Sequence, residues 1–218
     1  MTPPRLALLD YDAGNLRSVS RALEVAGAQV EIVTSWDQVD AAPPAALVLP
    51  GQGHFRDCQE KLVARGLWPL CLDWLSRGRP FLGICVGYQL LFESSEEAPG
   101  TPGMGFYAGT VKKFKARRDV KVPHMGWDTL RFTQPVAPLW RGLPAEPSVY
   151  YAHSYYPAPA DPALAAAVTD YGGVSFAAAL ADGPVAAVQF HPEKSQEVGL
   201  TILRNFVASL PPAAVQDV

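Results

Sequence analysis

Residues 81–93 read FLGICVGYQLLFE. A cysteine, Cys85, stands in this apolar run with Gly83 two places before it and Gly87 two places after it. The spacing is that of the nucleophile elbow G-x-S-x-G, with sulfur in place of oxygen. Cysteine is also among the most buried residue types, so a small core residue would fit the same five letters. These five residues alone leave both interpretations open.

Apolar runs and helical patterns alternate along the chain on either side of this stretch. Buried strands are expected at Arg5–Asp10, Gln29–Val33, Ala45–Leu49 and Pro80–Ile84. Helices are expected from Leu16 to a stop at Gly27, between Pro50–Gly53 and about Ser76, and over Gly87–Glu93. The alternation predicts an α/β fold with an open, largely parallel central sheet that carries helices on both faces.

The second half of the chain has a different texture, with short strands that predict antiparallel additions to the sheet. They follow the loop Ala98–Gly105 and are expected within residues 106–133 and at Val149–Tyr156, Ala163–Thr169, Val174–Ala179 and Val185–Phe190. A last helix follows Ser195, which we expect to cap it. We expect one domain over residues 1–210 and a short tail over residues 211–218.

Composition excludes several classes of function. The net charge is −3 and the pI about 5.8, which gives no sign of the clustered basic face that nucleic-acid binding needs. No apolar stretch approaches the roughly 18 residues of a membrane span, and the N-terminal run is too short for a signal peptide. We therefore expect a soluble, cytoplasmic protein.

The three cysteines, Cys58, Cys71 and Cys85, cannot all pair within one chain, so we expect reduced thiols. His54 and Cys58 are four residues apart, but this is half a metal site without a second half. The basic segment Lys112–Lys121 fits a solvated hairpin better than a docking site for an anionic partner.

A thiol nucleophile needs a base, and the base needs a group that orients it. His191 is the best candidate among the four histidines, because it follows the apolar run Val185–Phe190 at a strand end. In open α/β sheets the chemistry lies at such ends. Glu193, two residues further on, can hold the tautomer of the imidazole.

Thiolate catalysis also needs donors for an oxyanion. The turn Pro50–Gly53 follows a strand, and its glycines let backbone N–H groups turn inward, so one of these with the N–H of Val86 would make a pair. A dinucleotide loop is excluded because Arg56 stands where a third glycine is required. The chain order Cys, His, Glu disfavours an α/β-hydrolase, and a papain-type signature around the cysteine is absent.

Together, GICVGYQ at 83–89 and HPE at 191–193 resemble the class I (triad) glutamine amidotransferases. Further segments resemble one branch of that family, the glutaminase subunits of imidazole glycerol phosphate synthase. These segments are Asp10-Tyr11 with Gly14–Leu16, PGQGHF at 50–55, PHMGW at 123–127, YAHSY at 151–155 and QFHPEKS at 189–195. The resemblance covers nearly the whole chain and implies a flavodoxin-like fold.

The resemblance also implies roles for single residues. Cys85, His191 and Glu193 would form the catalytic triad, and Gln52 and Val86 would supply the oxyanion hole. The glutamine pocket would be lined by Gly51, Gly53, Gln89, Glu97, His153, Ser154 and Tyr155. The interface with a (β/α)8-barrel cyclase, the partner subunit in a heterodimer, would include Asn15, Trp127 and Lys194. No cofactor and no metal is implied.

The implied reaction converts glutamine to glutamate and ammonia, and the cyclase uses the ammonia to form imidazole glycerol phosphate and AICAR in histidine biosynthesis. The alternative is a glutaminase subunit that supplies another synthase, in the purine, pyridoxal or folate pathway. A binding domain without activity and a stand-alone thiol hydrolase are the other options. Gln52 departs from the small aliphatic residue usual in the family, and Val86 and Tyr88 replace the usual Leu and Met.

Overall fold

The computed structural model describes residues 2–41, 43–118, 120–134 and 136–211. Its main feature is an eight-stranded sheet in the order β2-β1-β3-β4-β13-β12-β11-β8. The strands on the parallel side are β1 (Arg5–Leu9), β2 (Gln29–Val33), β3 (Ala46–Leu49), β4 (Phe81–Ile84) and β13 (Val185–Val188). The antiparallel side consists of β12 (Val174–Asp182), β11 (Ala165–Tyr171) and β8 (Arg131–Phe132).

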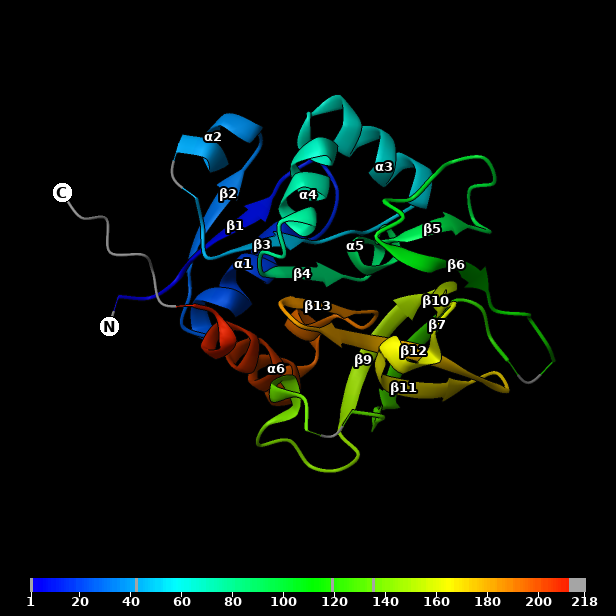
Figure 1. Cartoon of the computed structure of the whole chain (residues 1–218). Helices are drawn as coiled ribbons and strands as arrows, with labels where there is room; N and C mark the ends of the chain where they lie inside the picture. Colours follow the sequence, from blue (N-terminus) through cyan, green and yellow to red (C-terminus); the bar gives the residue numbers. More distant parts are fainter. Residues whose placement is uncertain (1, 42, 119, 135, 212–218) are drawn as a thin grey trace.

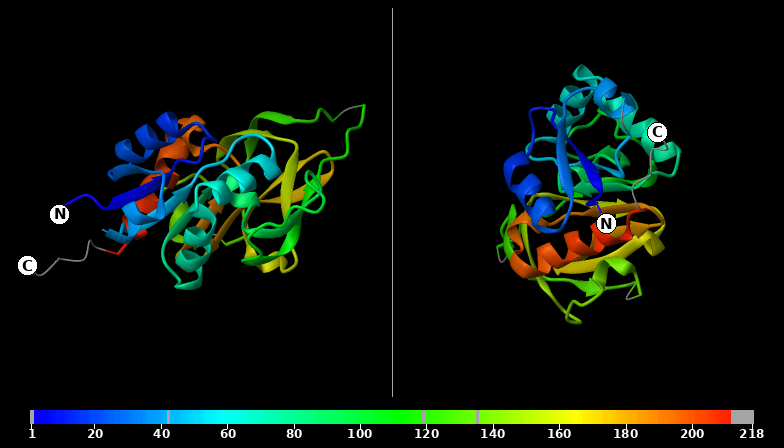
Figure 2. Two further views of the ribbon diagram at one scale, coloured as in Figure 1. Left: turned by 90° about the horizontal axis from the view of Figure 1, so that it is seen from above. Right: turned by 90° about the vertical axis from the view of Figure 1, so that its left-hand side faces the viewer.

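Helices cover the parallel part of the sheet on both faces (Figures 1 and 2). On one face α1 (Leu16–Val25) packs against α6 (Gln196–Ser209), and on the other α3 (Phe55–Ala64) packs against α4 (Leu67–Ser76). Strands β1, β3, β4 and β13 are buried almost throughout, as expected for strands covered from both sides. A helix α2 (Trp36–Ala41) follows β2.

Two small sheets lie beside the antiparallel part of the molecule. One has the order β10-β6-β5 and the other joins β7 to β9. Their bounds are β5 (Phe92–Ser95), β6 (Tyr107–Lys113), β7 (His124–Thr129), β9 (Ser148–His153) and β10 (Tyr155–Pro159). Short helical turns complete the described chain: α5 (Val86–Gln89), η1 (Pro138–Trp140), η2 (Pro162–Leu164) and η3 (Pro192–Lys194).

The expected α/β class, the largely parallel sheet and the antiparallel additions are confirmed. Two expectations about elements were wrong, and one helix was missed. The helix expected to run to Glu93 ends at Gln89, because the apolar residues after it enter β5. The strand expected over Val149–Tyr156 breaks at Ser154, where the chain passes from one small sheet to the other. Helix α2, rich in polar residues, was not expected at all.

The basic segment Lys112–Lys121 links β6 to β7 and projects from the body of the molecule (Figures 1 and 2). An antiparallel bridge between Arg117 and Val120 closes its turn, and its lysines and arginines are exposed up to Arg118. This agrees with the solvated hairpin. None of the helices in the described ranges is long and apolar enough to cross a membrane.

Candidate active site

Cys85 stands between β4 and α5 in a strained backbone conformation, with φ 54° and ψ −109°. The turn is tight enough to require both flanking glycines. A Cβ on Gly87 would lie 2.0 Å from the carbonyl oxygen of Leu49, and a Cβ on Gly83 would lie 2.9 Å from that of Gly87. The structure therefore forms the sharp strand-to-helix elbow that the sequence predicts, with the thiol at its apex.

Parallel pairing of β4 with β13 brings the candidate base to the thiol. Ile84 is opposite Val188, and the N–H of Cys85 donates to the carbonyl of Val188 at 2.8 Å. Both strands end at the same edge of the sheet, so His191 leaves that edge beside Cys85. Its Nδ1 is 2.9 Å from Oε1 of Glu193, and the two side chains are 7% and 1% exposed.

The surroundings of His191 favour the imidazolium. Burial alone lowers the pKa of His191, but hydrogen bonds and negative charge from Cys85 and Glu193 outweigh it and raise that pKa to about 10. A protonated imidazole beside a thiolate is the resting form of an activated cysteine. The structure thus brings the three residues of the expected triad together.

Ser195 lies at the N-cap of α6, as expected, but its side chain does not cap the helix. Its Oγ donates to the carbonyl of His191 at 2.7 Å and accepts from the N–H of Tyr150 at 2.9 Å. The N–H of His191 in turn donates to the carbonyl of Tyr150 at 2.9 Å. Ser195 therefore links the turn at His191 to β9 by hydrogen bonds. The expectation that its side chain caps α6 was wrong.

A cavity of about 210 Å³ opens in front of the thiol. Nine of the expected site residues line it: Gln52, Gly53, Cys85, Val86, Gln89, Glu97, His153, Ser154 and Tyr155. Gly51 does not line it, because it packs against Val86 and Gly87, where a Cβ would come within 2.7 Å of both. Pro123 and Ala152 line it as well and were not named individually, although the segments PHMGW and YAHSY contain them.

The polar groups around this cavity are connected by hydrogen bonds. One oxygen of Glu97 accepts from the N–H of Phe55 at 2.8 Å, at the start of α3. Nε2 of Gln89 donates to the carbonyl of Tyr155 and to Oε1 of Gln189, both at 3.0 Å. Gln189 Nε2 lies 3.6 Å from Sγ of Cys85. Sequence reasoning gave Gln189 no separate role, because it lies in the run that reads as a buried strand.

The Pro50–Gly53 loop is held from behind by buried side chains. The Tyr11 hydroxyl donates to the carbonyl of Pro50 at 2.6 Å, and Sγ of Cys58 donates to the carbonyl of Gln52 at 3.5 Å. Val86 is the first residue of α5, so its N–H has no partner within the helix. Gln52 and Val86 thus lie on the same cavity, with the loop fixed against the elbow.

Cys58 and Cys71 are free and buried like Cys85, which agrees with reduced thiols. Burial raises the pKa of Cys58 to about 11 and that of Cys71 to about 12. Neither is therefore a nucleophile near neutral pH. Across the described part of the chain, no group of three or more His, Cys, Asp or Glu side chains is placed to hold a metal ion.

The family model for glutamine amidotransferase class-I matches residues 7–210. This chain belongs to the class-I glutamine amidotransferases. The protein named imidazole glycerol phosphate synthase subunit HisH from Synechococcus sp. strain JA-3-3Ab is 48% identical over 208 residues, 95% of this chain and 94% of the relative. The protein of that name from Deinococcus radiodurans is 51% identical over 211 residues, 96% of both chains.

A solved structure of PurLQS from Thermotoga maritima is similar to this amidotransferase in fold. The TM-score is 0.74 at 20% identity, over 95% of this chain and 99% of the other. At that identity the likeness concerns the fold alone. It agrees with the open sheet and the helices on both faces.

Three expected interface residues of this amidotransferase are exposed in one region. Asn15 caps α1, accepting weakly from the N–H of Ser18. Trp127 on β7 is 48% exposed and meets the ring of Tyr150 edge-on at 6.0 Å. Lys194 is exposed as well, with its Nζ 6.0 Å from the centroid of the same ring. Both α1 and β9 contact η3, the turn that contains Lys194.

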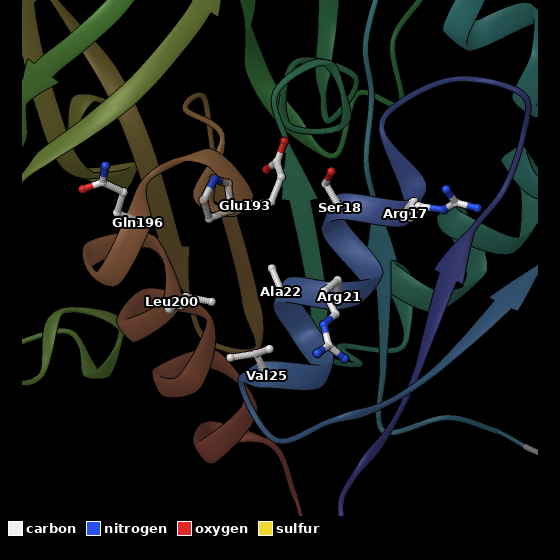
Figure 3. A pocket seen from close by; sticks show the side chains of 9 residues that line it. Arg17, Ser18, Arg21, Ala22, Val25, Glu193, Gln196 and Leu200 are labelled. Atoms are coloured by element: carbon white, nitrogen blue, oxygen red, sulfur yellow. The ribbon is translucent and has the colours of Figure 1, made fainter.

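A second cavity, of about 410 Å³, lies between α1 and α6 of the amidotransferase, behind the triad (Figure 3). Figure 3 shows Arg17, Ser18 and Arg21 contributing from α1, with Gln196 and Leu200 contributing from α6. Glu193 lines it too, and its Oε2 is buried without a hydrogen-bond partner. This cavity therefore reaches the back of the triad and borders the region of Asn15 and Lys194.

Proposed function

We propose that this chain hydrolyses glutamine to glutamate and ammonia and passes the ammonia to the cyclase subunit of imidazole glycerol phosphate synthase. The observation that carries the proposal is the elbow thiol of Cys85 facing the His191–Glu193 pair across neighbouring strand ends, with a polar cavity in front of it. The relatives named imidazole glycerol phosphate synthase subunit HisH support the choice of pathway.

In the proposed mechanism the thiolate of Cys85 attacks the carboxamide carbon of glutamine. The carbonyl oxygen becomes an oxyanion, and His191 gives its proton to the departing amide nitrogen, which leaves as ammonia. A γ-glutamyl thioester remains on Cys85. His191, now neutral, takes a proton from water as that water attacks the thioester, and the thiolate leaves as glutamate forms. Glu193 holds Nδ1 of His191 throughout.

We assign the oxyanion to the N–H groups of Val86 and Gln52. The first is free at the start of α5, and the second lies on the loop that Tyr11 and Cys58 hold in place. Each donor of this kind contributes about 3 kcal/mol to lowering the barrier in other enzymes. The side chain of Gln52 is exposed, so the departure from a small aliphatic residue leaves the backbone donor in place.

The remaining cavity residues would bind the amino-acid end of glutamine. Glu97 has a second oxygen beyond the one that accepts from Phe55, and a carboxylate suits the α-ammonium group of the substrate. Gly53, Gln89 and the segment His153–Tyr155 line the rest of the cavity. Gly51 supports the elbow from below and leaves the substrate contacts to its neighbours.

For the partner we propose a (β/α)8-barrel cyclase in a heterodimer, in the cytoplasm, forming imidazole glycerol phosphate and AICAR from the ammonia. Asn15, Trp127 and Lys194 would face it. Gly14, the neighbour of Asn15, lies against the Pro50–Gly53 loop, with a notional Cβ 3.4 Å from the side chain of Pro50 and 3.6 Å from the backbone nitrogen of Gly51. Docking at Asn15 would therefore act directly on the oxyanion loop. We propose that residues 1–210 form a single domain, which the continuous core supports.

The proposal is tested by mixing the chain with a cyclase subunit and its ligand and measuring glutamate release. Glutamate should form at a rate that rises on addition of the partner, and Cys85→Ala should lose essentially all of it, at least 10³-fold. Cys71→Ala is the matched control, because it removes a buried thiol on α4 that does not line the cavity, and it should keep the activity. Full activity of Cys85→Ala would disprove the nucleophile, and full activity without any partner would disprove the coupling.

A further inference from the structure

Gln189 lies opposite Cys85 because of the sheet register. Val188 is paired with Ile84 at the ends of β13 and β4. The residues that follow these two strands, Gln189 and Cys85, are therefore also neighbours. The N–H of Gln189 donates to the carbonyl of Ala178 at 2.8 Å, which fixes its backbone on β12. The side chain is fully buried, with no exposed area. A buried amide must find partners for its donors and its acceptor.

The direction of every bond in this cluster follows from one backbone carbonyl. The carbonyl of Tyr155 can only accept, so Gln89 must present its NH2 group to it. The same NH2 group reaches Gln189 at 3.0 Å, so Gln189 must present its oxygen there. The nitrogen of Gln189 is then the group that faces Sγ of Cys85, at 3.6 Å.

The carbonyl of Tyr155 also accepts a second hydrogen bond, from His153. Nδ1 of His153 lies 2.8 Å from it, so that nitrogen carries a proton and donates. Nε2 of His153 then carries no proton and lies 3.2 Å from Nδ1 of His124. Burial lowers the pKa of His153 to about 3, so it stays neutral and keeps this arrangement over the working range of pH.

We infer that Gln189 is a partner of the nucleophile: its N–H stabilises the thiolate of Cys85, and its oxygen turns Gln89 so that Gln89 offers only a carbonyl oxygen to the cavity. The part concerning Gln89 and glutamine rests on the proposed function. The part concerning the thiolate does not, because it follows from the bonds around the sulfur alone. A donor aimed at the sulfur favours the charged form over the thiol.

The first test measures how fast iodoacetamide alkylates Cys85 in the isolated full chain between pH 5.5 and 10. Gln189→Met keeps the volume but removes the donor, so the pH profile should move up by about one unit and the rate at any pH below the midpoint of the profile should fall about tenfold. Gln189→Glu places a carboxylate beside the sulfur. Its negative charge disfavours the thiolate, so the pH profile should move up further than in Gln189→Met. Gln29→Met and Gln29→Glu, on the exposed edge strand β2, are the matched controls and should leave it unchanged.

Peptide mapping checks that Cys58 and Cys71 stay unmodified, and urea unfolding checks that each variant is folded. A folded Gln189→Met chain with the wild-type profile would overturn the inference. Gln89→Met is the second variant, because it leaves Gln189 in place but removes its anchor. It should move the pH profile of alkylation upward by a smaller amount than Gln189→Met does. An unchanged profile would contradict the inference that the carbonyl of Tyr155 orients Gln189 through Gln89.

The second test uses the complex with the cyclase and separates KM from kcat for glutamine. Loss of the oxygen that orients Gln89 should raise KM in Gln189→Met by about tenfold, beyond the fall in kcat from the weaker thiolate. An unchanged KM would mean that Gln189 does not orient Gln89 toward glutamine. Only its hydrogen bond to the sulfur of Cys85 would then remain. Because the alkylation test needs neither glutamine nor a partner, a chain without glutaminase activity would refute the proposed function and still leave the sulfur contact measurable.

Discussion

Cys85 has a positive φ, which a side chain with a Cβ adopts only under constraint, at a cost of about 1–3 kcal/mol. The surrounding backbone over-determines this conformation. The carbonyl of Cys85 accepts from the N–H groups of Tyr88 and Gln89, while its own N–H donates to Val188. The strain holds the sulfur above the strand end, clear of its own backbone and in reach of His191.

Replacing Glu193 by Gln should lower the pKa of His191, because a carboxylate that favours the imidazolium is removed. The raised pKa contributes stability that is fully present below the ordinary histidine pKa of 6.5 and is lost as pH rises through about 10. Wild type should therefore exceed Glu193→Gln by about 1–3 kcal/mol in unfolding free energy at pH 6.

Urea titrations at pH 6 and pH 10 measure this difference, which should shrink markedly at the higher pH. Glu60→Gln, on the exposed side of α3, is the control and should show no comparable change between the two pH values. A difference between Glu193→Gln and wild type that grows with pH would contradict the assigned charge state.

At this scale the sequence predicts the residues whose chemistry has a local signal. The glycines around Cys85 and the Pro-Glu pair after His191 can be seen in a short window of letters. Gln189 has no such signal, because its role depends on which residue lies opposite it in the next strand. Gly51 was assigned to the substrate through the family resemblance, and its packing against Val86 and Gly87 is likewise visible only in the coordinates.

Among the elements, α5 is defined by how closely its backbone approaches the sheet. Gly87→Ala would put a methyl group on the carbonyl oxygen of Leu49, and the backbone of β3 cannot move aside without disturbing the core. We expect a loss of more than 3 kcal/mol in unfolding free energy, measured by urea denaturation.

The control for this substitution is Gly27→Ala. Gly27 has a positive φ, 99°, which Gly87 does not, and a Cβ at Gly27 meets nothing within 4 Å. Its cost should be limited to backbone strain, about 1 kcal/mol. A loss in Gly87→Ala no larger than that in Gly27→Ala would contradict the role assigned to the close approach of Gly87 to Leu49.

Element boundaries were harder to predict than element order. The apolar letters after Gln89 suit a helix or a strand, and pairing with β6 decides for a strand. Likewise Val149–Tyr156 has strand propensity throughout, but Ser154 is where the pairing partner changes from β7 to β6. In both cases contacts distant in sequence decide what local propensity leaves open.

For the whole molecule, the exposed ring of Trp127 is the part of the proposed cyclase interface that a single substitution tests best. Trp127→Ala should weaken binding to the cyclase about 30-fold, near 2 kcal/mol, as truncating an aromatic anchor commonly does. Isothermal titration of the two subunits measures it.

Phe106→Ala serves as the control, since Phe106 is another partly exposed aromatic residue and lies outside the region of Asn15, Trp127 and Lys194. It should bind the cyclase as wild type does. If Trp127→Ala also binds with unchanged affinity, the partner docks elsewhere on the molecule.

The place of β13 in the sheet has a consequence for how the protein is made. It is among the last elements in the chain, yet it pairs with β4 on one side and β12 on the other. A chain growing from its N-terminus on the ribosome therefore carries Cys85 for about a hundred residues of synthesis before His191 exists, with one edge of β4 unpaired. Ammonia cannot be released by an unfinished chain, because the order of synthesis makes the base and its carboxylate, His191 and Glu193, the last parts of the triad to arrive.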